Sequence, residues 1–107
     1  GLGFAWLALV GFVRLATRRG ILARPLETED ALGVVDDWLA APHARLLEAT
    51  SRHWPILRRL LAGAGVAGNL TNDAHLAALA IEHGATLVSF DRDFERFAGL
   101  RLELLRD

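Results

Sequence analysis

The sequence predicts an α/β domain with a short, mostly parallel sheet flanked by helices. Segments with helical periodicity alternate with apolar segments of about five residues, which is typical of a parallel sheet covered by helices. The chain has 107 residues, 52% of them hydrophobic, and a net charge of −1, which indicates a globular rather than a disordered chain. This length suits one hydrophobic core and not two. We therefore expect a single domain over residues 1–107.

The first half of the chain predicts two helices and a strand. A helix is expected over 2–19, because this segment is apolar nearly all round and ends in arginines that suit the negative end of a helix dipole. Gly20 is expected to end it. Thr28 is expected to cap a second helix, over 28–39. The short apolar segment 45–49 is typical of a strand.

The second half predicts two more helices and two strands. Ser51 is expected to cap a helix over 52–63 whose apolar residues share one face. A helix over 71–83 should end at Gly84, a residue that favours the left-handed conformation found after helix ends. The remaining elements are expected to be a strand over 86–89, a helical turn over 92–97 and a strand over 101–105.

Several residue types and segments narrow the functional classes. The chain has no Cys, which excludes disulfides and thiolate metal sites and is compatible with a cytoplasmic location. The apolar run 2–13 is shorter than the roughly twenty residues that span a bilayer, so no membrane association is expected. The chain does not begin with Met, and we expect residues upstream. All twelve basic residues are Arg, which fits a GC-rich genome or, alternatively, phosphate binding by bidentate guanidinium groups.

Three acids are expected to meet at one edge of the sheet. Asp73 lies near the start of the helix over 71–83, whereas Asp91 and Asp93 follow the strand over 86–89. A helix of about ten residues rises roughly 15 Å, and about five extended residues return nearly the same distance. The three carboxylates should therefore converge and repel one another unless a cation lies between them. Mg²⁺, or alternatively Mn²⁺, suits such oxygen ligands, and phosphodiester hydrolysis is the chemistry that such ions support.

Each of these residues also has a purely structural interpretation. Asp73 can stabilise the start of its helix through the helix dipole. Asp91 can cap the turn over 92–97, and Asp93 can pair with Arg92 or with Arg96 on the surface. Ser89 can donate to a carboxylate or a phosphate oxygen, or it can simply satisfy backbone groups at the end of the strand.

Other polar and aromatic residues are expected to be structural. On a helix, His75 points away from Asp73, and the other histidines lie near turns or helix ends where solvated side chains are common. We therefore expect no ligand among His43, His53, His75 and His83. Three aromatic residues are expected to pack the acid-bearing turn against the sheet: Phe90, Phe94 and Phe97.

The stretch 69–97 resembles the C-terminal half of PIN-domain ribonucleases of the VapC toxin type. The similarity rests on Asn69-Leu70-Thr71-Asn72-Asp73-Ala74-His75, on Glu82-His83-Gly84-Ala85-Thr86-Leu87 and on Ser89-Phe90-Asp91-Arg92-Asp93-Phe94. The resemblance implies a PIN-like three-layer domain and a magnesium-dependent endoribonuclease, the toxin of a type II toxin–antitoxin pair. It also implies neutralisation by a small VapB-like antitoxin and a homodimeric assembly.

The resemblance assigns roles to particular residues. Asp73 matches the family's third acid, Asp91 its fourth, and Asp93 the additional acid often found two residues later. Ser89 matches the small hydroxyl residue before this turn. Contacts to RNA or to the antitoxin are expected from three arginines: Arg14, Arg18 and Arg92.

Two features depart from the family pattern. The first acid belongs at the end of an N-terminal strand, and nothing in this chain corresponds to that strand, so the N-terminal part of the domain is expected to be absent. A Glu often precedes the helix Arg by three residues, but the residue three before Arg14 is Gly11. These departures predict weak or no nuclease activity for residues 1–107 alone.

Two other functions compete with the nuclease. The first is a non-catalytic partner-binding module on a degenerate nuclease scaffold, which the missing first acid and Gly11 favour. The second treats Asp91 and Asp93 as the nucleophile pair of a haloacid-dehalogenase-like phosphatase. That pair belongs after the first strand of its fold, whereas here fewer than twenty residues follow it.

Overall fold

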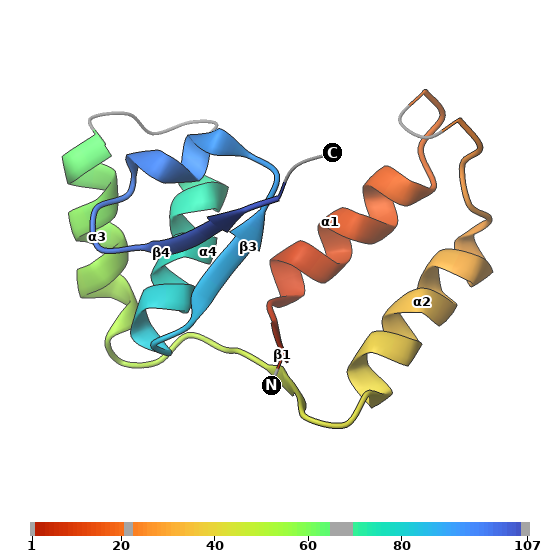
Figure 1. Ribbon diagram of the computed structural model, residues 1–107, viewed down its shortest axis with the longest axis horizontal. Helices are drawn as coiled ribbons and strands as arrows, with labels where there is room; N and C mark the ends of the chain where they lie inside the picture. The colour runs from red at the N-terminus through yellow and green to blue at the C-terminus, as the bar shows by residue number, and fades with distance from the viewer. Residues whose placement is uncertain (1, 21–22, 65–69, 106–107) are drawn as a thin grey trace. The chain divides into compact units, whose positions relative to one another are not determined.

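The computed structural model describes residues 2–20, 23–64 and 70–105, and they form helices alternating with short parallel strands (Figure 1). The chain divides into two compact units, Gly1–Leu47 and Glu48–Asp107. Each unit contains a two-stranded parallel sheet together with helices. The predicted α/β class with parallel pairing is therefore confirmed, and the single-domain assignment stays a prediction.

The first unit contains β1 (Leu2–Phe4), α1 (Trp6–Ala16), α2 (Thr28–Ala40) and β2 (Ala44–Leu46). The two strands are parallel, with Gly3 opposite Arg45. Trp38 on α2 joins the elements, because its ring stacks on Phe4 at 5.9 Å and packs against Phe12 of α1 at 4.7 Å between ring centroids. An aromatic cluster therefore links α1, α2 and β1.

The prediction of one helix over 2–19 is wrong at both ends. Residues Leu2–Phe4 form a strand because they pair with β2, and Gly3 lies so close to Leu47 that a Cβ atom there would be 2.6 Å from Leu47 Cδ1. The helix therefore begins at Trp6. It ends at Ala16, where the Thr17 hydroxyl donates to the Val13 carbonyl at 2.8 Å and so competes with a further helical turn.

The second unit contains α3 (His53–Ala64), α4 (Leu70–Glu82), β3 (Thr86–Ser89), the 3₁₀ helix η1 (Arg92–Arg96) and β4 (Arg101–Leu104). All five predicted elements are confirmed to within two residues. Gly84 has the expected positive φ of 64° after α4. The expected cap of α3 is wrong in detail: Thr50, and not Ser51, accepts the His53 N–H through its carbonyl at 3.0 Å.

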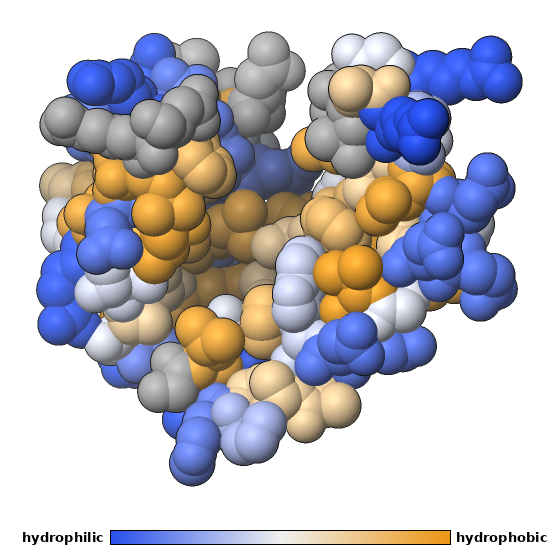
Figure 2. Space-filling view, turned by 45° about the vertical axis from the view of Figure 1, so that its right-hand side comes forward, coloured by the Kyte–Doolittle hydropathy of each residue, from blue (hydrophilic) through white to orange (hydrophobic). Residues whose placement is uncertain are grey.

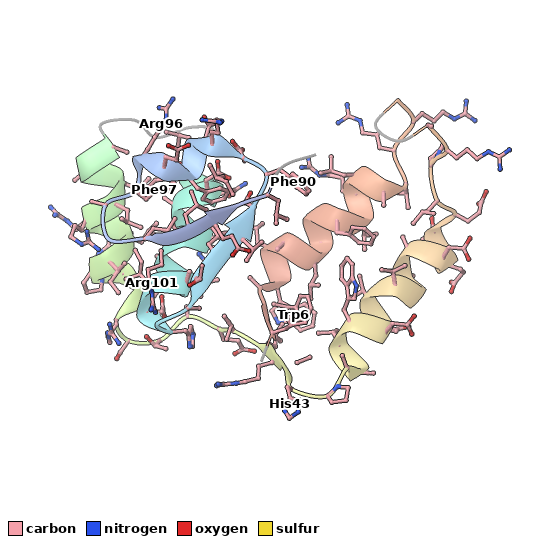
Figure 3. All side chains as sticks on the ribbon, viewed as in Figure 1. Trp6, His43, Phe90, Arg96, Phe97 and Arg101 are labelled. Carbon is pink, nitrogen blue, oxygen red and sulfur yellow. The ribbon has the colours of Figure 1, made fainter. Side chains whose placement is uncertain are left out.

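Small residues on α4 allow the second unit to pack closely. Ala74, Ala77 and Ala78 are fully buried against Leu60 of α3 and against two aromatic rings after β3. Those rings, Phe94 and Phe97, lie in the core as predicted. Phe90 does not, since 64% of it is exposed and its side chain points away from the position of Phe97 (Figure 3).

Among the described residues, no helix has both the length and the apolar character needed to cross a bilayer.

Two predicted boundaries in the first unit shift slightly. Glu27 rather than Thr28 precedes the first turn of α2, and β2 begins one residue early and ends at Leu46.

Candidate metal centre

The predicted convergence of three acids is observed within the second unit. Asp73 extends from the first turn of α4, whereas Asp91 and Asp93 lie at the start of η1, just after β3. One carboxylate oxygen from each residue lies within 4.8 Å of the others. Asp73 is partly buried, and Asp91 and Asp93 are exposed to solvent. These distances allow a single cation to contact all three side chains.

Local hydrogen bonds hold the acid-bearing turn in place. Ser89 Oγ accepts the Asp91 backbone N–H at 3.0 Å, and Asp91 Oδ1 accepts the Asp93 N–H at 2.8 Å. The structural interpretations of Ser89 and Asp91 are therefore correct, but they do not exclude a ligand. Asp91 keeps its second carboxylate oxygen for a cation, and the Ser89 hydroxyl keeps its proton for donation to an acceptor.

The surface pairing expected for Asp93 is not found. Arg92 instead approaches Glu95, with 3.8 Å between Nη1 and Oε1, and both side chains are largely exposed. An exposed pair at this separation contributes little to stability. In the part of the chain that the structure describes, Asp93 makes no ion pair with Arg92 or Arg96, so its carboxylate is available to a ligand.

The electrostatics of the cluster fit a divalent cation. Burial raises the pKa of Asp73, and the nearby carboxylates of Asp91 and Asp93 raise it further. The ionised form of Asp73 is thus disfavoured at this position, and a cation between the three acids would remove that repulsion. All the donor atoms are carboxylate oxygens, which suit hard ions such as Mg²⁺ and Mn²⁺ better than softer metals.

We expect Asp73→Asn to stabilise the protein in the absence of divalent metal. A carboxyl whose pKa is raised by folding costs stability as the pH rises through that pKa, so the gain should be present at pH 7 and absent in acid. Removing a charge repulsion typically stabilises a protein by about 0.5–2 kcal/mol. Thermal unfolding in EDTA at several pH values would measure this, and a lower melting temperature for the variant at pH 7 would contradict it.

The three predicted arginines are divided between the units. Arg92 lies on η1 between two of the acids, whereas Arg14 is on α1 and Arg18 follows that helix. Gly11, which stands where the family resemblance expects a second acid, lies within α1. A Cβ atom at Gly11 would meet nothing within 4 Å, so packing within the described residues does not require glycine there.

Sequence reasoning missed a second polar cluster, and its expectation of a solvated side chain is wrong for one member, His53, which is only 12% exposed. The Glu82 carboxylate on α4 accepts the Thr50 N–H at 2.6 Å and contacts Nδ1 of His53. His53 Nε2 in turn lies 2.9 Å from His75 Nδ1. Part of the signal was present in the sequence: Glu82 lies seven residues after His75, so both occupy one face of an alanine-rich helix, although no local pattern marks His53 as their partner.

Burial and hydrogen bonding act in opposite directions within this second cluster. Burial by itself raises the pKa of Glu82, but the hydrogen bonds from His53 and Thr50 outweigh it and hold that pKa below its usual range. Burial lowers the pKa of His75, and the neighbouring His53 lowers it further, against an opposing effect of Glu82. The Glu82 carboxylate is therefore ionised near neutral pH, and His75 is neutral.

With the fold and the acid cluster described, the class of protein follows from comparison with known families. The PIN domain model matches residues 7–100, and the chain belongs to the PIN-domain family, in its VapC-type branch. The resemblance based on residues 69–97 is thereby confirmed.

Comparison with individual proteins shows high sequence identity to curated ribonucleases of the VapC type. The chain is 58% identical over 99 residues to ribonuclease VapC37 of Mycobacterium tuberculosis, a match that covers 92% of this chain and 69% of that protein. It is 46% identical over 100 residues to ribonuclease VapC33 of the same species, covering 94% and 70%. Among solved structures, VapBC2 from Rickettsia felis bound to a DNA fragment from their promoter matches with a TM-score of 0.67 and 21% identity. That match covers 95% of this chain and 73% of the other, and it supports the fold.

Proposed function

We propose that this protein is a metal-dependent endoribonuclease that hydrolyses RNA phosphodiester bonds in the cytoplasm, as the toxin of a toxin–antitoxin pair. The observation that carries this proposal is the convergence of Asp73, Asp91 and Asp93 within 4.8 Å at one end of α4 and β3. The names of the relatives, ribonucleases of the VapC type, support the same reaction class. Mg²⁺ is the proposed cofactor, with Mn²⁺ as a substitute.

In this proposal the three acids bind the metal, and the neighbouring polar residues contact the RNA or the antitoxin. Asp73, Asp91 and Asp93 hold the cation, which when bound orients the scissile phosphate and lowers the pKa of a water molecule. The Ser89 hydroxyl is free to donate its proton to a phosphate or carboxylate oxygen. Arg92, exposed beside the acids, offers a planar guanidinium group to an RNA phosphate. Arg14 and Arg18 are proposed as further contacts to RNA or antitoxin.

The proposal is tested by incubating the full protein with RNA in the presence of Mg²⁺ or Mn²⁺ and in EDTA. Cleavage with metal and none in EDTA is the expected result. Absence of cleavage with either metal would contradict the proposal. If thermal stability also stayed unchanged by Mg²⁺ while an antitoxin bound tightly, the alternative of a non-catalytic partner-binding module would be favoured instead.

We further propose that an antitoxin helix binds the groove between α1 and α2. This groove has a volume of about 590 Å³ and lies entirely within the first unit. Hydrophobic surface is visible over this helix pair in Figure 2. The groove carries Arg14 from α1 and two acids, Glu29 and Asp36, from α2, so it would match an amphipathic helix that bears both charges. Its apolar lining consists of Trp6, Leu9, Val10, Val13, Leu32 and Val35.

We expect Val10→Asp to weaken antitoxin binding by about tenfold or more, because it replaces an apolar side chain that lines the groove with a carboxylate that a bound apolar helix face would remove from water. Val10 is 62% exposed, so the substitution should not disturb the fold. Leu15→Asp is the matched control, since Leu15 is an exposed apolar residue of the same helix that does not line the groove. Titration of each variant with the cognate antitoxin measures the effect. Equal binding by both variants would place the antitoxin elsewhere.

The homodimer that the family resemblance implies is also proposed here. Sedimentation of the full protein, alone and with its antitoxin, would test this.

A further inference from the structure

The second polar cluster contains a buried charge that the proposed reaction does not use. The Glu82 side chain is fully inaccessible to solvent, although an ionised carboxylate in such a position is costly unless it is paired and hydrogen-bonded. Glu82 receives the Thr50 N–H at 2.6 Å and a contact from His53. Every buried side-chain polar atom among the described residues has a partner. The hydrogen bonds of the buried Glu82 carboxylate are therefore satisfied. Poor packing does not explain why a charged side chain is buried at this position.

The cluster links the start of α3 to two positions along α4, His75 and Glu82. His75 and Glu82 are seven residues apart, hence on one face of α4 and separated by about 10 Å along its axis. His53 lies between them, with Nδ1 toward Glu82 and Nε2 at 2.9 Å from His75 Nδ1. Arg52 adds a bond from Nη1 to the Glu82 carbonyl at 3.2 Å. The segment just before and at the start of α3 thus holds α4 by four hydrogen bonds.

The apolar contact between α3 and α4 is less specific than these bonds. The residues of α4 that are fully buried in the core cluster are Ala74, Ala77 and Ala78, and the partly buried Leu76 and Ile81 pack against them. Apolar contacts, and methyl groups above all, favour one rotation or translation of a helix less strongly than hydrogen bonds do, because hydrogen bonds are directional. Buried polar groups are known to select one register between helices at some cost in stability. The Glu82–His53–His75 chain has the position and directionality for this role.

The position of α4 matters for the acid cluster because Asp73 lies on its first turn, two residues before His75. A displacement of α4 by one residue along its axis moves Asp73 by about 1.5 Å relative to Asp91 and Asp93. A change of that size is large for a site whose ligand atoms lie within 4.8 Å of one another.

We propose that Glu82, His53 and His75 are positioning residues that set the register of α4 and thereby hold Asp73 in place for the metal. This inference rests on the proposed function, since it concerns the same acid cluster. The three side chains do not need to touch the metal, the RNA or the reacting atoms.

The test compares Mn²⁺ affinity, measured by titration calorimetry on the full protein, among variants of the chain. His75→Phe removes the bond nearest Asp73 but leaves Glu82 with both of its partners, so the protein should fold. It should weaken Mn²⁺ binding by about tenfold, the usual size of effect for residues that orient metal ligands. His83→Phe is the matched control, because His83 directly follows the same helix and its side chain bonds, among the described residues, only the Glu48 carbonyl. It should bind Mn²⁺ like the wild type.

Glu82→Gln separates positioning from charge. The amide can accept from Thr50 and donate to His53 Nδ1, so that His53 Nε2–H donates to His75 and the chain persists with its direction reversed. Wild-type Mn²⁺ affinity in this variant supports positioning through connected hydrogen bonds. Loss of affinity in Glu82→Gln equal to that in His75→Phe would overturn the proposal, as would wild-type affinity in a folded His75→Phe protein.

A structural measurement keeps the two proposals distinguishable. If wild-type protein binds no Mn²⁺, the proposed nuclease function fails, and crystal structures of the wild type and of His75→Phe then decide the positioning role. We expect a longer separation between the Asp73 and Asp91 carboxylates in the variant. An unchanged separation would overturn the positioning role independently of any metal. Should His75→Phe fail to fold, the smaller His75→Leu variant, which likewise makes no hydrogen bond to His53, serves in its place with the same expected directions.

Discussion

Replacement of Asp91 by Asn should reduce RNA cleavage by at least about a hundredfold while the protein keeps its fold. Residues that only orient metal ligands typically contribute 10–100-fold to affinity or activity, so loss of a direct ligand should cost at least as much. The structural role of Asp91 survives the change, because Asn Oδ1 can still accept the Asp93 N–H that Asp91 accepts at 2.8 Å. The variant therefore separates the charge of Asp91 from its capping function.

The measurement is the initial rate of RNA cleavage at saturating Mg²⁺, together with the melting temperature of each protein. Asp30→Asn is a suitable control, since Asp30 is an exposed acid in the first turn of α2 and lies outside the cluster. Asp91→Ala adds the loss of the cap and should also be less stable than Asp91→Asn. Wild-type cleavage by Asp91→Asn would show that the carboxylate charge is not needed, and the metal-site assignment would then fail.

The second unit shows how far chain geometry alone carries a prediction. Its elements are consecutive in sequence and each has a local signal: the alanine-rich helix, Gly84 after it, and the apolar strand that leads to Asp91. Because helix rise and strand rise nearly cancel, the meeting of Asp73 with Asp91 and Asp93 follows from element lengths without knowledge of the side-chain packing. The observed distance within 4.8 Å agrees with this reasoning.

The errors arose where a contact distant in sequence outweighs a local preference. Residues Leu2–Phe4 continue the apolar pattern of α1, and only their pairing with β2, some forty residues later, makes them a strand. His53 has the same property, since its partners Glu82 and His75 are 29 and 22 residues away. A histidine near a helix start is commonly solvated, and no local pattern distinguishes the exception. Long-range hydrogen bonds of this kind require the tertiary structure.

His53→Ala should be among the most destabilising single substitutions in the second unit, by about 3 kcal/mol near neutral pH. Removing the hydrogen-bond partner of a buried charge typically costs 3–5 kcal/mol, because the charge then stays buried without compensation. Here Glu82 would keep the Thr50 N–H at 2.6 Å, so the lower part of that range is expected. Urea unfolding of wild type and variant at pH 7 measures the difference. His83→Ala is the control, since His83 bonds only a backbone carbonyl at 2.8 Å and should cost much less.

The pH dependence identifies the cause. In the wild type, burial alone would raise the pKa of Glu82, but the hydrogen bonds from His53 and Thr50 outweigh burial and lower it. The contribution of Glu82 to the stability of the wild type is therefore fully present above the usual carboxyl range. It is lost as the pH falls through the lowered pKa. In His53→Ala burial acts against fewer bonds, and the pKa should rise. Protonation of Glu82 then relieves the variant of its buried charge, while the wild type loses the stabilisation that its hydrogen bonds give to the ionised carboxylate. The two proteins should therefore converge in stability on acidification, whereas a difference independent of pH would assign the loss to packing alone.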